Sequence, residues 1–327
     1  MINRISNECA ASPLSALELL KQTSSSSPSD IDSIRYLPTG IDTLDKNLNG
    51  GLRIQNLTEI VGRAGVGKTQ LGMQLCVTAA ILEQGSIYID TECKMSLMRM
   101  EEIADGRYQS NFSSNNKYKK ASEVLSNVVI HSPRSTKEMQ IVISNLEEDI
   151  LIRNENPDLF PIRLVVLDSI AAPTRRDFGT EKAQDRVSAL FHISQVLKRM
   201  ADQLQLVVVV INQVGVLNKI SNDDNHNNDG SDFVAVSAAL GVSWHHCVST
   251  RLLLEHERDP HREASDLDLA QEAAMADQSY DHNDKNHLPA WSRMRGFVRT
   301  VSVVKSNVVD FSRMFYEINK EGIQELL

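Results

Sequence analysis

The stretch LTEIVGRAGVGKTQLGMQL, residues 57–75, decides how the rest of the chain is interpreted. An apolar run leads into a glycine-rich turn, and the sequence after the turn is typical of a helix. The turn fits the pattern GxxxxGKT, in which glycines let backbone N–H groups point inward beside the positive end of a helix dipole. Such a turn binds phosphate, and an ordinary strand-to-helix turn is the weaker alternative. The residues expected to form the site are Gly62, Arg63, Ala64, Gly65, Val66, Gly67, Lys68, Thr69 and Gln70.

Five polar side chains predict the chemistry around this turn. Lys68 adds a full positive charge, and the Thr69 hydroxyl is suited to Mg²⁺, which prefers oxygen ligands. Asp168 ends the apolar run RLVVLD and is the candidate acid on the metal side, with a turn or helix-cap aspartate as the alternative. If the strand before Glu92 neighbours the strand before the turn, Glu92 can orient a water for attack on a γ-phosphate. Gln213, at the end of LVVVVINQ, would then sense that phosphate.

Composition sets broad limits on the class of protein. The chain has 327 residues, of which 41% are hydrophobic and 24% charged, as expected for one large α/β domain with appendages. The longest aliphatic run, Leu206 to Ile211, is too short for a membrane span, so we expect a soluble intracellular protein. A net charge of −9 argues against a uniformly basic surface but leaves room for local DNA-binding loops. Four scattered cysteines and the pair His245–His246 indicate neither a disulfide framework nor a zinc site.

Strands alternate with helices through the middle of the chain and give way to strands at its end. This order predicts a mostly parallel α/β sheet flanked by helices, with antiparallel strands added last and the ligand at the carboxyl edge. We expect a flexible tail or linker at 1–34 and a core at 35–327. Two polar segments interrupt that core: an asparagine- and aspartate-rich loop at about 215–237, and an acidic insertion at about 255–290.

Local patterns give several further expectations. Helices are predicted from Thr69 to about Gln84 and after a capping box at Ser135 and Glu138, with Met139, Ile143, Leu146 and Ile150 on one face. Thr39 is a possible helix cap. The segment PTRRDFGTE is expected to be a loop, and LGVSWHHCVSTRLLLE to resume the sheet.

Five motifs taken in order resemble the ATPase core of RecA-type recombinases, especially the eukaryotic recombinase paralogues. They are GRAGVGKTQ, IYIDTE, LVVLDSIAAPTRRDF, VVINQV and ALGVSWHHCVSTRLLL, and the likeness covers roughly residues 36–255. The resemblance implies a RecA-like P-loop fold that binds ATP and Mg²⁺ and acts on single-stranded or junction DNA. It also implies a role in homologous recombination and double-strand-break repair, in a heteromer with another paralogue. The implied location is the nucleus, with the cytoplasm as a further location.

The resemblance also assigns roles by position. It implies phosphate and Mg²⁺ binding by Lys68 and Thr69, a water-activating carboxylate at Glu92, a metal-side acid at Asp168 and a γ-phosphate sensor at Gln213. Two DNA-facing loops correspond to about 172–184 and 215–237. Arg175 and Arg176 would meet the DNA backbone, as paired guanidinium groups can, with solvated surface arginines as the alternative.

Departures from the family pattern favour a mediator over an autonomous strand-exchange enzyme. Gly65 stands where strand-exchange recombinases carry an arginine that covers the adenine, and no phenylalanine precedes Phe112 to serve in a polymerisation motif. Four aspartates make the second DNA loop acidic, which opposes phosphate binding. We therefore expect a weak DNA-dependent ATPase. The alternatives are a non-catalytic adaptor of the same fold and, with less support, an unrelated P-loop enzyme such as a nucleotide kinase or hexameric helicase.

Overall fold

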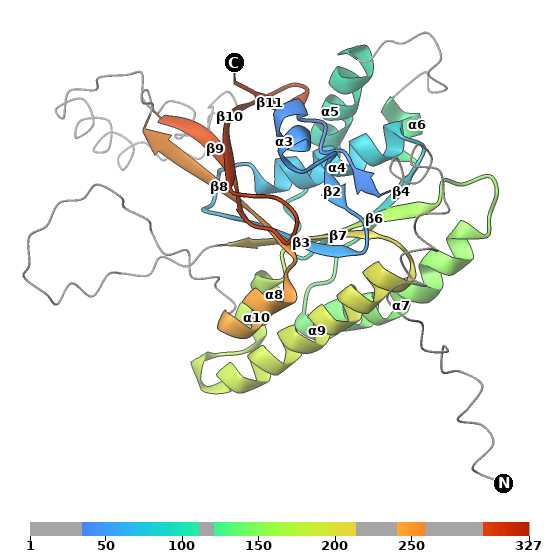
Figure 1. Ribbon diagram of the computed structural model, residues 1–327. Coiled ribbons are helices and arrows are strands. Elements are labelled where there is room, and N and C mark those ends of the chain that lie inside the picture. The colour runs from blue at the N-terminus through green and yellow to red at the C-terminus, as the bar shows by residue number, and fades with distance from the viewer. Residues whose placement is uncertain (1–34, 111–120, 214–240, 259–296, 327) are drawn as a thin grey trace, which may run out of the picture. The chain divides into compact units, whose positions relative to one another are not determined.

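The computed structural model describes residues 35–110, 121–213, 241–258 and 297–326 (Figure 1). The chain divides into two units, Met1–Tyr36 and Leu37–Leu327. Only Arg35 and Tyr36 of the first unit are described, so the predicted tail at 1–34 lies outside the described residues. Everything that follows concerns the second unit.

A nine-stranded sheet forms the centre of this unit, counted over the described residues. Its strand order is β11-β10-β9-β8-β3-β7-β6-β4-β5. The six strands from β8 to β5 are parallel, and β9, β10 and β11 continue the sheet in antiparallel fashion. The predicted sheet, mostly parallel with late antiparallel strands, is therefore confirmed. The strands are β3 (Asn56–Gly62), β4 (Gly85–Asp90), β5 (Val128–His131), β6 (Ile162–Asp168), β7 (Val207–Gln213), β8 (Thr250–Arg258), β9 (Phe297–Lys305), β10 (Ser312–Asn319) and β11 (Gly322–Glu325), with short strands β1 (Tyr36–Leu37) and β2 (Leu52–Arg53) in a separate pair.

Helices cover both faces of the sheet (Figure 1). One layer contains α3, α4, α5 and α6, and the other contains α7, α8, α9 and α10. The central strands β6 and β7 are consequently apolar on both faces, which explains their unbroken runs of valine and leucine. The helices are α3 (Asp42–Asn47), α4 (Lys68–Ile81), α5 (Leu97–Ser110), α6 (Ala121–Leu125), α7 (Thr136–Asn154), α8 (Ala171–Asp177), α9 (Ala183–Gln203) and α10 (Gly241–Cys247), with a single 3₁₀ turn, η2 (Thr180–Lys182).

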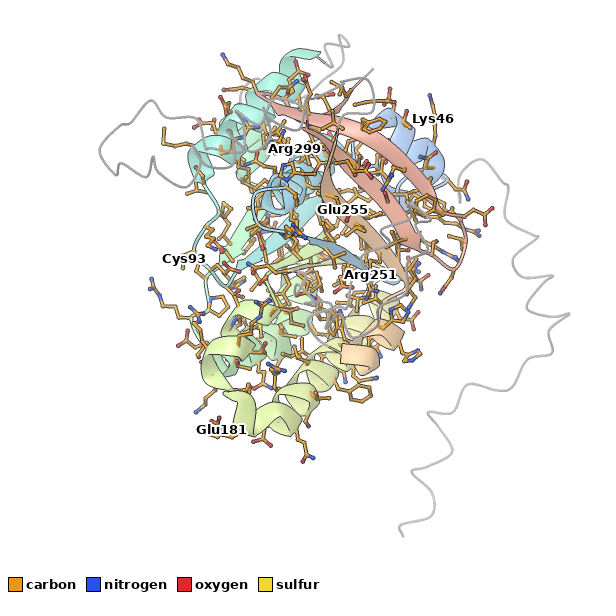
Figure 2. The ribbon with its side chains drawn as sticks, turned by 90° about the vertical axis from the view of Figure 1, so that its left-hand side faces the viewer. Lys46, Cys93, Glu181, Arg251, Glu255 and Arg299 are labelled. Carbon is orange, nitrogen blue, oxygen red and sulfur yellow. The ribbon has the colours of Figure 1, made fainter. Side chains whose placement is uncertain are left out.

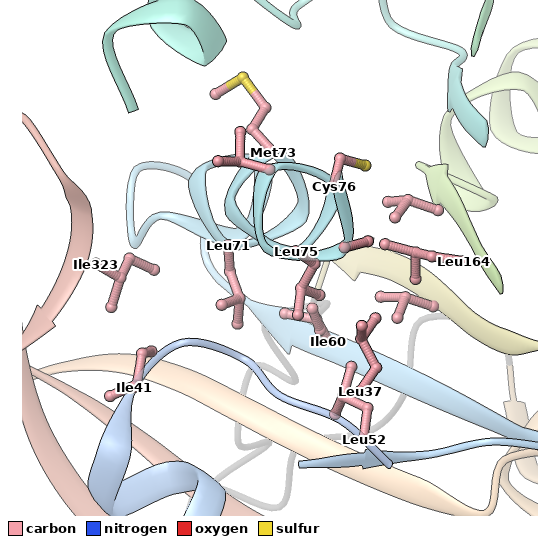
Figure 3. Packing of buried hydrophobic residues seen from close by; sticks show 14 of the residues in the cluster. Leu37, Ile41, Leu52, Ile60, Leu71, Met73, Leu75, Cys76, Leu164 and Ile323 are labelled. Atoms are coloured by element: carbon pink, nitrogen blue, oxygen red, sulfur yellow. The ribbon is translucent and has the colours of Figure 1, made fainter. Parts of the chain in front are cut away.

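Helix α4 is buried on nearly all sides, which fixes the turn that precedes it. Leu71 and Leu75 face Ile60 of β3, while Met73 and Cys76 point the other way into the same apolar cluster (Figure 3). A helix that is apolar all round needs partners all round, and α5, α6 and β11 supply them. Truncating a side chain such as Leu75 to alanine would cost about 2–5 kcal/mol because the surroundings close only partly over the cavity.

Several local predictions are confirmed. The Ser135 hydroxyl accepts a hydrogen bond from the Glu138 backbone N–H at 3.1 Å and caps α7 as the capping-box pattern indicates. The four expected apolar residues of α7 are buried, as are Cys76 and Cys247. The last strands, β9, β10 and β11, pair in antiparallel fashion as expected, and Gly322 takes a φ of 100° where β10 turns into β11.

Other local predictions are wrong. Helix α4 ends at Ile81, and Gly85 is already the first residue of β4. Thr39 does not cap α3; instead its backbone N–H and hydroxyl both donate to the Asp45 carboxylate, at 2.7 and 2.8 Å. An acid inside the short helix thus satisfies the donors that precede it.

Two segments were assigned the wrong secondary structure. PTRRDFGTE was expected to be a loop, but α8 and η2 occupy most of it, because a proline such as Pro173 is tolerated in the first turn of a helix. Residues 241–247, expected in the sheet, form α10.

Strand β8 extends to Arg258, into the predicted acidic insertion. Residues 214–240 and 259–296 lie outside the described residues. Among the helices that the structure describes, none is long and apolar enough to span a membrane.

Arg107 ties the C-terminal strands to the start of the unit. This α5 residue is 5% exposed, and its guanidinium donates to the carbonyls of Glu321, Gly40 and Ile323 at 2.8, 3.1 and 3.2 Å. Burial lowers the pKa of Arg107 to about 10, against the opposing effect of the Glu321 carboxylate, so the side chain stays charged at neutral pH. One cation thus satisfies carbonyls from two distant parts of the chain.

We expect Arg107→Ala to lower the free energy of unfolding by about 2–4 kcal/mol, because three carbonyls lose a charged donor in a buried site. Urea unfolding followed by circular dichroism measures the loss. Arg199→Ala is the matched control, since that helical arginine is 58% exposed and meets Glu147 at the surface. Equal losses in the two variants would contradict the role assigned to Arg107.

Candidate nucleotide-binding site

The glycine-rich turn lies between the carboxyl end of β3 and the first residue of α4. Gly67 caps the helix with a φ of 107°, a left-handed conformation that favours glycine, and a Cβ there would lie 2.7 Å from Ile318 Cδ1. A Cβ on Gly62 would lie 2.3 Å from the Leu254 carbonyl oxygen of the neighbouring strand β8. The Tyr316 hydroxyl of β10 donates to the Val66 carbonyl. Neighbouring strands therefore hold the turn in shape.

Lys68 is folded back onto this turn. It is 8% exposed, and its ammonium group donates to the carbonyls of Gly62 and Arg63 at 2.9 and 2.6 Å. Burial lowers the pKa of Lys68 to about 8, and the carboxylates of Asp168 and Glu92 oppose that fall. An anion bound in the turn would offer the ammonium group better acceptors than two carbonyls.

Asp168 and Thr69 meet directly across the turn. The Thr69 hydroxyl donates to Asp168 Oδ2 at 2.7 Å, and the Tyr88 hydroxyl of β4 donates to the same oxygen at 2.8 Å. Burial raises the pKa of the Asp168 carboxyl, and these two hydrogen bonds limit the rise. A hydroxyl and a carboxylate oxygen at this separation are hard donors, which suits Mg²⁺ together with waters and phosphate oxygens. The residues present thus fit an ion that keeps several waters, and the described part of the chain contains no group of three or more His, Cys, Asp or Glu side chains placed to hold a metal ion by themselves.

Glu92 lies just after β4, at the same edge of the sheet. Its Oε1 accepts from the Ser169 hydroxyl at 3.1 Å and faces the Gln213 side-chain amide at 3.4 Å, while Oε2 forms an ion pair with Lys94. Burial by itself raises the pKa of Glu92, but Lys94 and the Ser169 hydroxyl outweigh it and hold the pKa below its usual value. The acid and the amide proposed to act on a γ-phosphate are therefore adjacent.

The route by which Glu92 reaches the site differs from the expectation. Strand β4 does not neighbour β3, because β7 and β6 lie between them. Glu92 still reaches Gln213 because all four strands are parallel and end at one edge. Backbone contacts close the gap, with the Thr91 N–H donating to the Asp168 carbonyl at 2.7 Å.

Sequence reasoning missed Tyr88 and Ser169 as parts of this site. Both are buried, and their hydroxyls reach Asp168 and Glu92 respectively. The signal for Tyr88 was present in the alternation of IYID, which sends Tyr88 and Asp90 to the same face of β4. Cys93, the residue after Glu92, is exposed at the surface (Figure 2).

A cavity of about 630 Å³ opens beside the glycine-rich turn. Arg99 of α5 reaches across it, because its Nε donates to Gln70 at 2.8 Å and its Nη2 donates to the carbonyl of Asn319, the last residue of β10. A planar guanidinium fixed at two points can stack on a flat ring. The size suits a small organic ligand. The cavity is lined by Gly65, Gly67, Lys68, Thr69, Gln70, Arg99, Glu102, Ile318, Asn319 and Lys320.

The two arginines predicted to face DNA differ from each other. Arg175 is exposed at the end of α8 and contributes to the low pKa of Glu92. Arg176 donates to the carbonyls of Thr91 and Arg134 at 3.3 and 3.0 Å, which ties its guanidinium to the chain. Arg175 is thus the freer of the two cations. The second expected DNA loop, 215–237, lies outside the described residues.

Comparison with known proteins identifies the family of the chain. The family profile described as Rad51 matches residues 32–268, more than half of the chain. The chain belongs to the Rad51 family. Its RecA-like fold is thereby confirmed, and the turn, Glu92, Asp168 and Gln213 all lie within the part that matches the Rad51 profile.

Individual relatives are similar over much of the chain. DNA repair protein RAD51 homolog 2 of Homo sapiens is 32% identical over 241 residues, 68% of this chain and 60% of that protein. DNA repair protein XRCC3 homolog of Arabidopsis thaliana is 27% identical over 303 residues, 88% and 92% of the two chains. DNA repair protein XRCC3 of Mus musculus is 25% identical over 317 residues, 95% and 80%. The chain thus spans less than two thirds of the human relative's length.

The buried lysine predicts an unusual dependence of stability on pH. Folded Lys68 has a pKa of about 8, whereas the usual pKa of a lysine, which applies in the unfolded chain, is 10.5. At pH values between these two pKa values, the unfolded state binds more protons than the folded state. The contribution of Lys68 to the free energy of unfolding therefore rises with pH, by on the order of 3 kcal/mol in total. Urea unfolding from pH 7.5 to 10 should show a steeper rise for the wild type than for Lys68→Met. Parallel curves would contradict the burial of a protonated lysine.

Tyr88→Phe should weaken the metal-dependent part of nucleotide binding. The variant keeps the ring in the core but removes the hydroxyl that orients Asp168, and loss of such a supporting hydrogen bond costs about tenfold in metal affinity. Calorimetric titration of Mg·ATP, and of ATP without Mg²⁺, separates the two contributions. We expect only the affinity for Mg·ATP to fall. An equal loss of affinity for Mg·ATP and for ATP without Mg²⁺, or no loss for either, would contradict a role in orienting Asp168.

Proposed function

We propose that this chain is an ATP-dependent DNA-binding protein that acts in homologous recombination and double-strand-break repair. The proposal rests above all on the contact of Glu92 with Gln213, at the sheet edge that also holds the glycine-rich turn. The similarity to relatives named as DNA repair proteins supports a role in repair. Single-stranded or junction DNA is the proposed ligand, another Rad51-family subunit the partner, and the nucleus the site of action.

In the proposed site the chain's own groups divide the work around a triphosphate. Backbone N–H groups of the turn and the Lys68 ammonium bind the phosphates. Thr69 and Asp168 would hold Mg²⁺, which would supply positive charge to the phosphate oxygens. Glu92 orients a water toward the γ-phosphate, and Gln213 beside it senses whether that phosphate is present. Arg99 covers the base in the adjoining cavity, where Gly65 leaves no side chain from the turn.

The ion pair of Glu92 with Lys94 supports slow turnover. A carboxylate whose pKa lies below its usual value is a weak base, and Lys94 competes with a water for the same oxygens. This observation favours a second candidate function: a non-catalytic adaptor in which bound ATP stabilises the contact with a partner subunit. The two functions differ in whether Glu92 affects turnover.

Turnover of ATP with and without single-stranded DNA distinguishes these functions. We expect slow wild-type hydrolysis that DNA stimulates, and a fall of about 10²-fold in Glu92→Gln, because a positioned general base contributes that much or more. If the wild type turns over no faster than Glu92→Gln, the adaptor function holds.

Lys68→Ala serves as the control for the binding site. It should abolish nucleotide binding measured by calorimetry. Residues 62–70 contain two cations, Arg63 and Lys68; Arg63 is exposed, and the variant removes the one whose ammonium group contacts the turn. Tight Mg·ATP binding by this variant would reject the assigned site, whichever of the two functions is correct.

A further inference from the structure

Glu59 is a fully buried acid on β3, three residues before the glycine-rich turn. Its Oε1 accepts from the Trp244 indole N–H at 2.7 Å and from the Asn212 side-chain amide at 3.0 Å. Its Oε2 accepts from Arg251 Nε, also at 2.7 Å. Both oxygens therefore act only as acceptors, and a buried carboxylate with three donors is held in one orientation.

Asn212 connects Glu59 to the proposed γ-phosphate sensor. Its side-chain Nδ2 donates to Glu59, while its Oδ1 accepts from the backbone N–H of Gln213 at 2.8 Å. Asn212 is fully buried, so both halves of its amide are satisfied within the protein. The backbone at Gln213, and hence the direction in which its side chain leaves the sheet, depends on this bridge.

The opposite side of Glu59 is connected to helix α10. Trp244 lies in that helix and is 2% exposed. Arg251 of β8, labelled in Figure 2, also contacts His245 Nδ1 at 2.8 Å, and because arginine can only donate, that ring nitrogen is an acceptor. Lys305 of β9 adds two bonds from its ammonium group, to the carbonyls of His245 and Val248. The helix is thus anchored to the same acid that orients Asn212.

We propose that Glu59 is a positioning residue that couples γ-phosphate sensing at Gln213 to the position of helix α10. The coupling passes through two shared hydrogen bonds on one oxygen, Oε1, which joins Asn212 and Trp244. A change at Gln213 that shifts Asn212 alters how Glu59 Oε1 accepts from Trp244. In the same way, a movement of α10 that shifts Trp244 alters the hydrogen bond from Asn212 to Glu59. This inference rests on the proposed function, because it requires that Gln213 responds to a γ-phosphate.

Trp244 itself reports on the coupling. The chain has two tryptophans, so Trp291→Phe leaves Trp244 as the sole indole fluorophore. In that parent, the Mg²⁺ complex of the slowly hydrolysed analogue ATPγS should shift Trp244 emission, and Mg·ADP should not. Calorimetry gives the affinities of both nucleotides independently of the fluorescence.

Asn212→Ala in the same background breaks the bridge and leaves the Glu59–Arg251 pair in place. We expect it to abolish the difference in emission between ATPγS and ADP and to lower the preference for ATPγS by about fivefold or more. Val209→Ala is the matched control, because it is buried in the same strand but packs on the opposite face. That variant should lose stability and keep both responses.

Asn212→Asp provides a second variant of nearly the same shape. It retains an acceptor for the Gln213 N–H but places a carboxylate against Glu59, so it should lose the response as Asn212→Ala does. A parental response that persists in both variants overturns the positioning role and leaves the proposed function standing. A parent that prefers ATPγS over ADP by calorimetry but shows no emission change specific to ATPγS overturns the coupling alone. A parent that shows neither overturns γ-phosphate sensing as well.

Discussion

The site depends on one constraint, namely that strands β3, β7, β6 and β4 run parallel and end at the same edge of the sheet. Register fixes Gly62 beside Gln213 and Asp90 beside Asp168, so polar residues that follow four separate apolar runs converge. The helices on both faces make this possible, since they bury the strands and leave only the carboxyl edge for polar groups. Side-chain contacts such as that of Thr69 with Asp168 then follow from backbone geometry.

At the carboxyl edge of the sheet, burial disfavours the charged forms of the site residues, and their hydrogen bonds and ion pairs oppose that effect. Burial raises the pKa of Asp168, with Asp90 and Glu92 adding to the rise, and it lowers the pKa of Lys68. Two hydroxyls stabilise the Asp168 carboxylate, two backbone carbonyls accept from Lys68, and Lys94 forms an ion pair with Glu92 at the surface. In such a site a phosphate can replace the carbonyls as the acceptor for Lys68, and a metal ion can bind the Asp168 carboxylate.

The sequence was sufficient for the parts of the fold that rest on local pattern. The glycine-rich turn, the capping box of α7 and the apolar runs of β6 and β7 each contain their own signal, and residues at strand ends identified the candidate site. Strand order could not be predicted from local pattern. The crossovers that place β6 and β7 between β3 and β4 are determined by contacts between residues far apart in the chain. Short helices such as α10 and α8 were missed because tertiary packing, and not propensity, decides seven-residue segments. Buried polar groups such as Glu59 and Arg107 gave no sequence signal, since their partners are distant in the chain.

The pairing of Glu59 with Arg251 spans 192 residues, and this separation has a consequence for synthesis of the protein. During translation the strand that bears the acid leaves the ribosome long before either strand that will flank it, β7 or β8. Until β8 follows, the carboxylate lacks its counter-ion, and the most apolar part of the chain has an open edge where a foreign strand could pair. The sheet around β3 is therefore complete only after the C-terminal half has been made, and until then its open edge is exposed to incorrect pairing.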